Sequence, residues 1–149
     1  MTAAVKDLYV EQGATFFLGF NWHREGPVVD GVVTPGTPYD ITGCTARMQV
    51  RRRQLDPPIV TATSETPGGG AGVGAGRIML GGETGRIEVT LTDEDTDLMD
   101  AKTSYYDLEI EWPLVDGELR PRVDRLLKGT VYVDPNMTQV DGDDPAVGP

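Results

Sequence analysis

The stretch Gly85-Arg-Ile-Glu-Val-Thr-Leu-Thr92 alternates polar and apolar side chains with a period of two. Ile87, Val89 and Leu91 therefore fall on one face, as expected of a strand with one buried side. A second alternating stretch follows it, with apolar positions at Tyr106, Leu108, Ile110 and Trp112. Two such strands cannot bury their apolar faces alone, so other strands of the chain must cover them.

The acidic segment between these strands, residues 93–100, predicts a short helical turn. Asp93, Asp95 and Asp97 have the spacing of the first ligands of a calcium loop, but the glycine and the final glutamate of such a loop are missing. Thr92 is instead placed to cap a helix whose first turn carries carboxylates, where the helix dipole favours negative charge. We therefore expect a structural turn and no metal site.

Further strands are predicted by the same alternation. They cover residues 6–10, 15–22, 45–53 and 123–134, with short partners at 59–63 and 77–80. Between Glu25 and Gly43, three prolines remove ladder hydrogen bonds, which favours a surface connection. The whole pattern predicts an all-β fold, an immunoglobulin-like β-sandwich of about seven to nine strands. We expect this domain to span residues 1–135 and an acidic C-terminal tail to span residues 136–149.

Composition limits the kinds of partner. The formal net charge of -11 opposes the phosphate backbone, so we expect no direct nucleic-acid binding. The single cysteine, Cys44, allows no intramolecular disulfide, which is compatible with a reducing compartment. No stretch has the apolar length of a signal peptide core or a membrane span, so we expect synthesis in a cytoplasm and no membrane partner.

The sequence gives no positive sign of catalysis or of a cofactor. The glycine-rich segment 68–76 lacks the lysine and hydroxyl residue of a phosphate-binding loop. The single histidine, His23, has no nucleophile motif beside it, and Cys44 reads as a small packed side chain. We therefore predict a binding protein, without catalytic, cofactor or metal residues. Its candidate partner contacts are Arg51, Arg52, Arg53, Gly70, Gly72, Gly74 and Tyr105.

Four segments of the chain together resemble a β-sandwich module of tailed-bacteriophage virion proteins, of the minor tail and baseplate type found in phages of actinobacteria. The segments are Tyr39-Asp-Ile-Thr-Gly43 leading into residues 44–50, Gly85-Arg-Ile-Glu-Val-Thr-Leu-Thr92, Tyr105-Tyr-Asp-Leu-Glu-Ile110 and Leu127-Lys-Gly-Thr-Val-Tyr-Val-Asp-Pro135. The acidic turn before Tyr105-Tyr106 also resembles the corner that precedes a strand in immunoglobulin-like sandwiches.

This resemblance implies a structural virion protein, made in the host bacterial cytoplasm, that binds other phage structural proteins in a symmetric multi-copy assembly. A minor tail, tail-tip or baseplate position is the first expectation. A capsid decoration or cement protein of the phage head is an alternative within the same class. A receptor-binding or carbohydrate-binding module is an alternative of another class, which exposed aromatics clustered at one loop end would favour.

Overall fold

Strands dominate the part of the chain that the computed structural model describes, residues 3–64, 75–100 and 102–135. The first six are β1 (Ala4–Val5), β2 (Leu8–Glu11), β3 (Phe16–Asn21), β4 (His23–Val29), β5 (Val32–Pro38) and β6 (Thr45–Arg51). The others are β7 (Val60–Thr63), β8 (Ala75–Leu80), β9 (Arg86–Leu91), β10 (Thr103–Glu111) and β11 (Val123–Asp134). A 3-10 turn, η1 (Gly82–Thr84), and one short helix, α1 (Asp93–Asp97), complete the fold.

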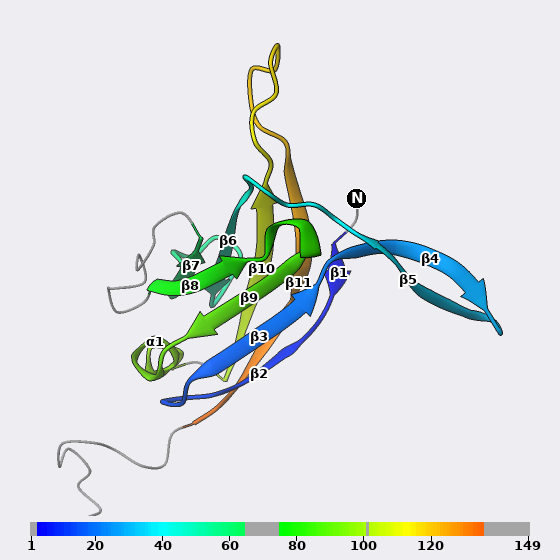
Figure 1. The fold of residues 1–149 in the computed structure, drawn as a ribbon. Coiled ribbons are helices and arrows are strands. Elements are labelled where there is room, and N and C mark those ends of the chain that lie inside the picture. Colours follow the sequence, from blue (N-terminus) through cyan, green and yellow to red (C-terminus); the bar gives the residue numbers. More distant parts are fainter. Residues whose placement is uncertain (1–2, 65–74, 101, 136–149) are drawn as a thin grey trace, which may run out of the picture.

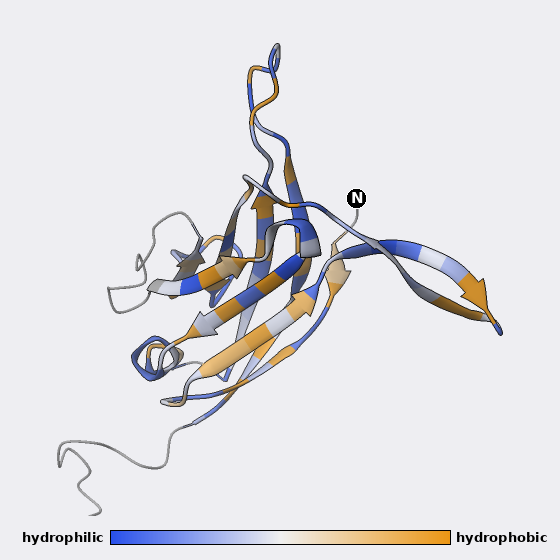
Figure 2. Cartoon of the chain, in the orientation of Figure 1, coloured by the Kyte–Doolittle hydropathy of each residue, from blue (hydrophilic) through white to orange (hydrophobic). Residues whose placement is uncertain are grey.

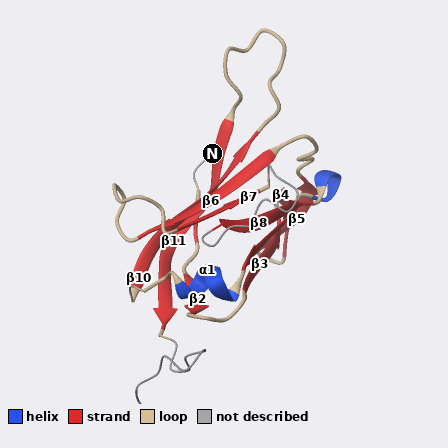
Figure 3. Ribbon diagram, turned by 90° about the vertical axis from the view of Figure 1, so that its left-hand side faces the viewer, coloured by secondary structure: helices blue, strands red, loops and turns tan. Residues whose placement is uncertain are grey.

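Nine of these strands form one curled sheet. Its order is β1, β11, β10, β6, β7, β8, β9 and β3, with β2 also paired to β11. The sheet curls so that the half containing β10 and β11 faces the half containing β9 and β3 (Figures 1 and 3). The remaining two strands, β4 and β5, form a separate sheet. The predicted all-β, sandwich-like fold is therefore confirmed, with strands in 57% and helical turns in 7% of the described residues.

The core lies between the two halves of the curled sheet. The inward positions of β6 predicted from the alternation, Ala46, Met48 and Val50, are all buried. Ile110 and Leu108 of β10 are fully buried, as are the inward residues of β9. Facing side chains come from the other half, and the buried set includes Leu18, Ile78, Ile87, Val89 and Leu91. Period-two alternation therefore assigned the buried face of these strands correctly.

Helix α1 starts as the acidic segment predicts. The side chain of Thr92 accepts the backbone N–H of Asp95 at 3.1 Å, and the Asp95 carboxylate accepts the N–H of Thr92 at 2.9 Å. This reciprocal pair is a capping box. Asp95 is buried and engaged in the cap, which explains why the aspartates here form a helix start and not a calcium loop.

The strand predicted at residues 6–10 is found as β2, which begins only at Leu8, and a further short strand, β1, precedes it at Ala4–Val5. Both run parallel to β11. Between them the chain steps away from β11 at Lys6 and Asp7. The Asp7 carboxylate accepts the backbone N–H of Thr130 at 3.0 Å, in the place of a ladder bond. Long-range pairing with β11 thus divides a segment that looks continuous in the sequence.

The segment between Glu25 and Gly43 is mostly exposed, as expected of a surface position, but it is not the irregular connection that its prolines predict. Strands β4 and β5 pair there as a hairpin that projects away from the sandwich (Figure 1). Asp30 and Gly31 form its tip with φ of 51° and 78°, the left-handed values that a tight hairpin turn requires. The register shifts before and after Glu25 accommodate the prolines. We call this hairpin, residues 23–38, the arm.

Candidate binding face

Three exposed tyrosines gather on the outer side of the curled sheet. Tyr9 of β2, Tyr132 of β11 and Tyr105 of β10 are 74%, 41% and 51% exposed. Strand alternation turns them outward because their neighbours Val10, Val133 and Tyr106 face the core. We call the outer side of β2, β11, β10 and β6 the tyrosine face.

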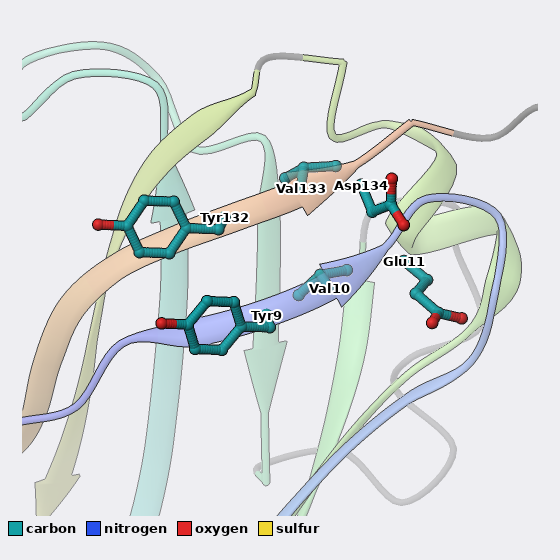
Figure 4. A pocket seen from close by; sticks show the side chains of 6 residues that line it. All are labelled: Tyr9, Val10, Glu11, Tyr132, Val133 and Asp134. Carbon is teal, nitrogen blue, oxygen red and sulfur yellow. The ribbon is translucent and has the colours of Figure 1, made fainter.

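One end of the tyrosine face is acidic. Tyr9 and Tyr132 are register partners, and their rings stack with centroids 5.3 Å apart and planes 19° apart. Two residues further along, Glu11 and Asp134 are also register partners on the same side of the sheet. Figure 4 shows the two rings side by side and the two carboxylates beyond them. Like charges directly opposite each other destabilise a strand pair. A cation supplied by another molecule would therefore stabilise the pair of carboxylates at Glu11 and Asp134.

The part of the tyrosine face away from Glu11 and Asp134 is a basic groove of about 1040 Å³. The charged side chains that line it are Arg47, Arg51, Arg125, Lys128, Asp107 and Glu109. Four cations and two carboxylates give it a local net charge of +2, opposite in sign to the -11 of the whole chain. Arg125 pairs with Asp107 at 3.4 Å, whereas no side-chain bond to Arg47 or Lys128 is found among the described residues. The groove is thus a place where an acidic group can bind.

The predicted contact residues divide into three groups. Arg51 and Tyr105 lie in the basic groove, side by side in the register of β6 and β10. Arg52 forms an ion pair with Asp100 at the end of β6, and Arg53 is exposed beside it. Gly70, Gly72 and Gly74 lie outside the described residues. The structure therefore brings together the arginine segment and Tyr105, which are more than fifty positions apart in the sequence.

Sequence reasoning missed the acidic end of the tyrosine face. The alternation of β2 and β11 marks Tyr9, Glu11, Tyr132 and Asp134 as outward, but it does not show that these strands are neighbours. Their parallel pairing joins the two ends of the domain. Tyr39 is half-buried, stacked on Trp22 at 4.1 Å with Arg24 over its ring.

The other candidate chemical groups are not brought together. His23 begins the arm, where its Nδ1 lies 3.0 Å from the carbonyl of Arg24. Cys44 lies at the entrance of β6, and burial raises the pKa of its thiol, which disfavours the reactive thiolate. Across residues 3–64, 75–100 and 102–135, the structure holds no cluster of three or more metal-ligating side chains.

Comparison with known protein families and with curated proteins finds no match to this chain. In the described part of the chain, no helix has the length and apolar character needed to cross a membrane.

Proposed function

We propose that the protein is a structural component of a tailed-bacteriophage particle, in the minor tail, tail tip or baseplate, and that it acts by protein–protein binding. The observation that carries this proposal is the arm. A hairpin that extends from its own domain can reach a neighbouring subunit, as the contacts of a multi-copy assembly require. The sequence resemblance to virion β-sandwich modules supports the same class of function.

The tip of the arm is apolar. Val28, Val29, Val32 and Val33 flank the turn and are 53–64% exposed. Figure 2 shows this apolar tip at the far end of the arm, beyond a more polar stem. Burial of apolar surface is favourable by about 25 cal/mol per Å². A partner that covers these valines would therefore gain binding free energy from them. The tip is therefore suited to insertion against another protein.

The arm also has free strand edges. β4 and β5 pair only with each other in the described part of the chain. An isolated two-stranded hairpin is marginally stable in water, and an unpaired edge can add to the sheet of another chain. A partner that covers the valines or extends this small sheet would stabilise the arm.

The alternatives differ in what the protein binds. A capsid decoration protein would use the same arm on the phage head. A carbohydrate-binding module is less well supported, because the exposed tyrosines lie on a sheet face and not at a loop end.

In the test, the purified protein is mixed with tails and with empty heads of the phage that encodes it, and binding is measured by co-sedimentation. We expect binding to tails, weakened at least tenfold by the double change Val28→Asp and Val33→Asp. The matched control is Leu114→Asp with Val115→Asp, because both residues are similarly exposed but lie in the β10–β11 loop. Binding to heads alone would assign the protein to capsid decoration, and binding to neither would overturn the proposal.

A further inference from the structure

We propose that the tyrosine face is a two-fold interface between two copies of this chain, in which the acidic end of each copy occupies the basic groove of the other. This inference deepens the proposed binding function by naming a partner and a surface. It does not require the phage assignment, because it rests on the charge pattern of one face.

The spacing on β11 fits a two-fold arrangement. Asp134, Tyr132, Thr130 and Lys128 alternate outward along one strand, from the acidic end to the basic groove. The six residue steps from Lys128 to Asp134 span about 20 Å. A two-fold axis through the midpoint of this span places Asp134 of one copy over Lys128 of the other, and the reverse contact follows from symmetry. The same surface is then used by both copies.

Charge complementarity favours a second copy over an unrelated partner. Two chains of net charge -11 repel each other at most orientations, so attraction must come from a local match. The paired carboxylates of Glu11 and Asp134 offer two negative charges, and neither forms an ion pair with another described residue. The groove offers Arg47 and Lys128 with no side-chain bond found in the described residues. The carboxylates at the acidic end of one copy can therefore pair with the cations in the groove of the other copy.

The tyrosines occupy the centre of the proposed interface. Tyr132 lies between Asp134 and Lys128 on β11, stacked on Tyr9, and Tyr105 lies opposite Thr130 on the neighbouring strand. Buried tyrosines at the centre of an interface commonly contribute most of the binding energy. They offer a large apolar area and a hydroxyl that can keep a hydrogen bond.

The size of the face predicts weak association. It covers four neighbouring strands, each about 4.8 Å from the next, and about 20 Å along them. This area is smaller than the roughly 800 Å² per partner of a stable interface. We therefore expect a dimer that forms only at high micromolar concentration of the free chain. Within an assembly that holds two copies close together, the higher effective concentration would strengthen the dimer.

The experiment is sedimentation equilibrium of the full chain at concentrations up to about 1 mM, a range chosen from the expected weak affinity. One variant reverses the acidic end, Glu11→Arg with Asp134→Arg. The other reverses the groove, Arg47→Glu with Lys128→Glu. A matched control reverses two acidic residues of the β10–β11 loop, Asp116→Arg with Glu118→Arg, which are exposed and away from the face.

We expect each reversed variant alone to dimerise at least tenfold more weakly than the wild type, and the control to dimerise no more weakly than the wild type. An equimolar mixture of the two reversed variants should form a heterodimer, because the basic end of the first then meets the acidic groove of the second, and the native end meets the native groove. A wild-type monomer at about 1 mM, or a mixture that does not associate, would overturn the inference. Binding to tails or heads is measured separately, so failure of the proposed function is distinguishable from failure of the dimer.

Discussion

The hydroxyl of Tyr106 donates a 2.6 Å hydrogen bond to the backbone carbonyl of Lys6, 100 residues earlier in the chain. Lys6 lies where the chain steps away from β11 between β1 and β2, and its carbonyl has no ladder partner there. At this crossing only a glycine fits on β11, since a Cβ on Gly129 would lie 2.3 Å from the Lys6 oxygen. The bond therefore fixes the N-terminal strands to the core of the sandwich.

Replacing Tyr106 with Phe removes this bond while keeping the ring in the core. The Lys6 carbonyl would lose this partly buried hydrogen bond, so we expect a loss of about 1 kcal/mol in the free energy of unfolding. Urea denaturation measures the change. Tyr105→Phe is the control, because Tyr105 is exposed on the same strand and should cost much less. Equal losses for both variants would contradict the structural role of the bond.

The same residue predicts a pH dependence of stability. Burial raises the pKa of Tyr106 to about 12, from an ordinary value of 10, with a further contribution from the charge of Asp7. Between these values the folded chain keeps a proton that the unfolded chain releases, so stability falls as the pH rises. We expect the unfolding free energy to decrease from pH 10 to pH 12, less steeply in Tyr106→Phe than in the wild type. Identical slopes would refute the assignment.

Ile110→Asp should prevent folding. Ile110 is fully buried in β10, where an unpaired carboxylate has neither water nor a cation. We expect a loss of more than about 4 kcal/mol, seen as the absence of a cooperative thermal transition. Ile110→Val is the control and should cost about 0.5–1.5 kcal/mol. If Ile110→Asp melted cooperatively at the wild-type temperature, the register of β10 would be wrong.

The capping box of α1 should behave as one unit. Thr92→Ala removes the acceptor for the Asp95 N–H, and we expect a loss of about 1 kcal/mol. Because each residue bonds the backbone of the other, Thr92→Ala with Asp95→Ala should cost less than the sum of the single changes. A double-mutant cycle by chemical denaturation measures this coupling, and strict additivity would argue against a reciprocal cap.

Ser104→Ala should leave stability unchanged or raise it by up to about 1 kcal/mol. The Ser104 hydroxyl is fully buried and finds no hydrogen-bond partner among the residues the structure describes. Thr96→Val provides the contrast, since the Thr96 hydroxyl donates to the Ala14 carbonyl at 2.8 Å and accepts the Gly13 N–H at 3.0 Å. That change should cost about 1–3 kcal/mol. Thermal melts of both variants would test the difference, and a marked loss in Ser104→Ala would reveal a missed partner.

Much of the fold follows from local patterns in the sequence. Alternation identified β3, β6, β9, β10 and β11, because a strand places successive residues on opposite faces. It also identified the buried side chains of β6, β9 and β10, but in β11 a bulge in the pairing with β10 buries both Leu126 and Leu127. Thr92 and the carboxylates that follow it identified the start of α1, because a cap involves residues only three positions apart. The arm had a local signal too, Asp30-Gly31 between paired valines, but the prolines around it outweighed that signal.

The sequence by itself determined which side chains of each strand face outward, since that depends only on the pleat of one strand. Only the tertiary structure decided which outward side chains meet. Tyr9 stacks on Tyr132, and Glu11 lies opposite Asp134, because β2 and β11 pair in parallel although they come from the two ends of the domain. Strand pairing at such a separation depends on burial of the whole core, which no short stretch of sequence encodes.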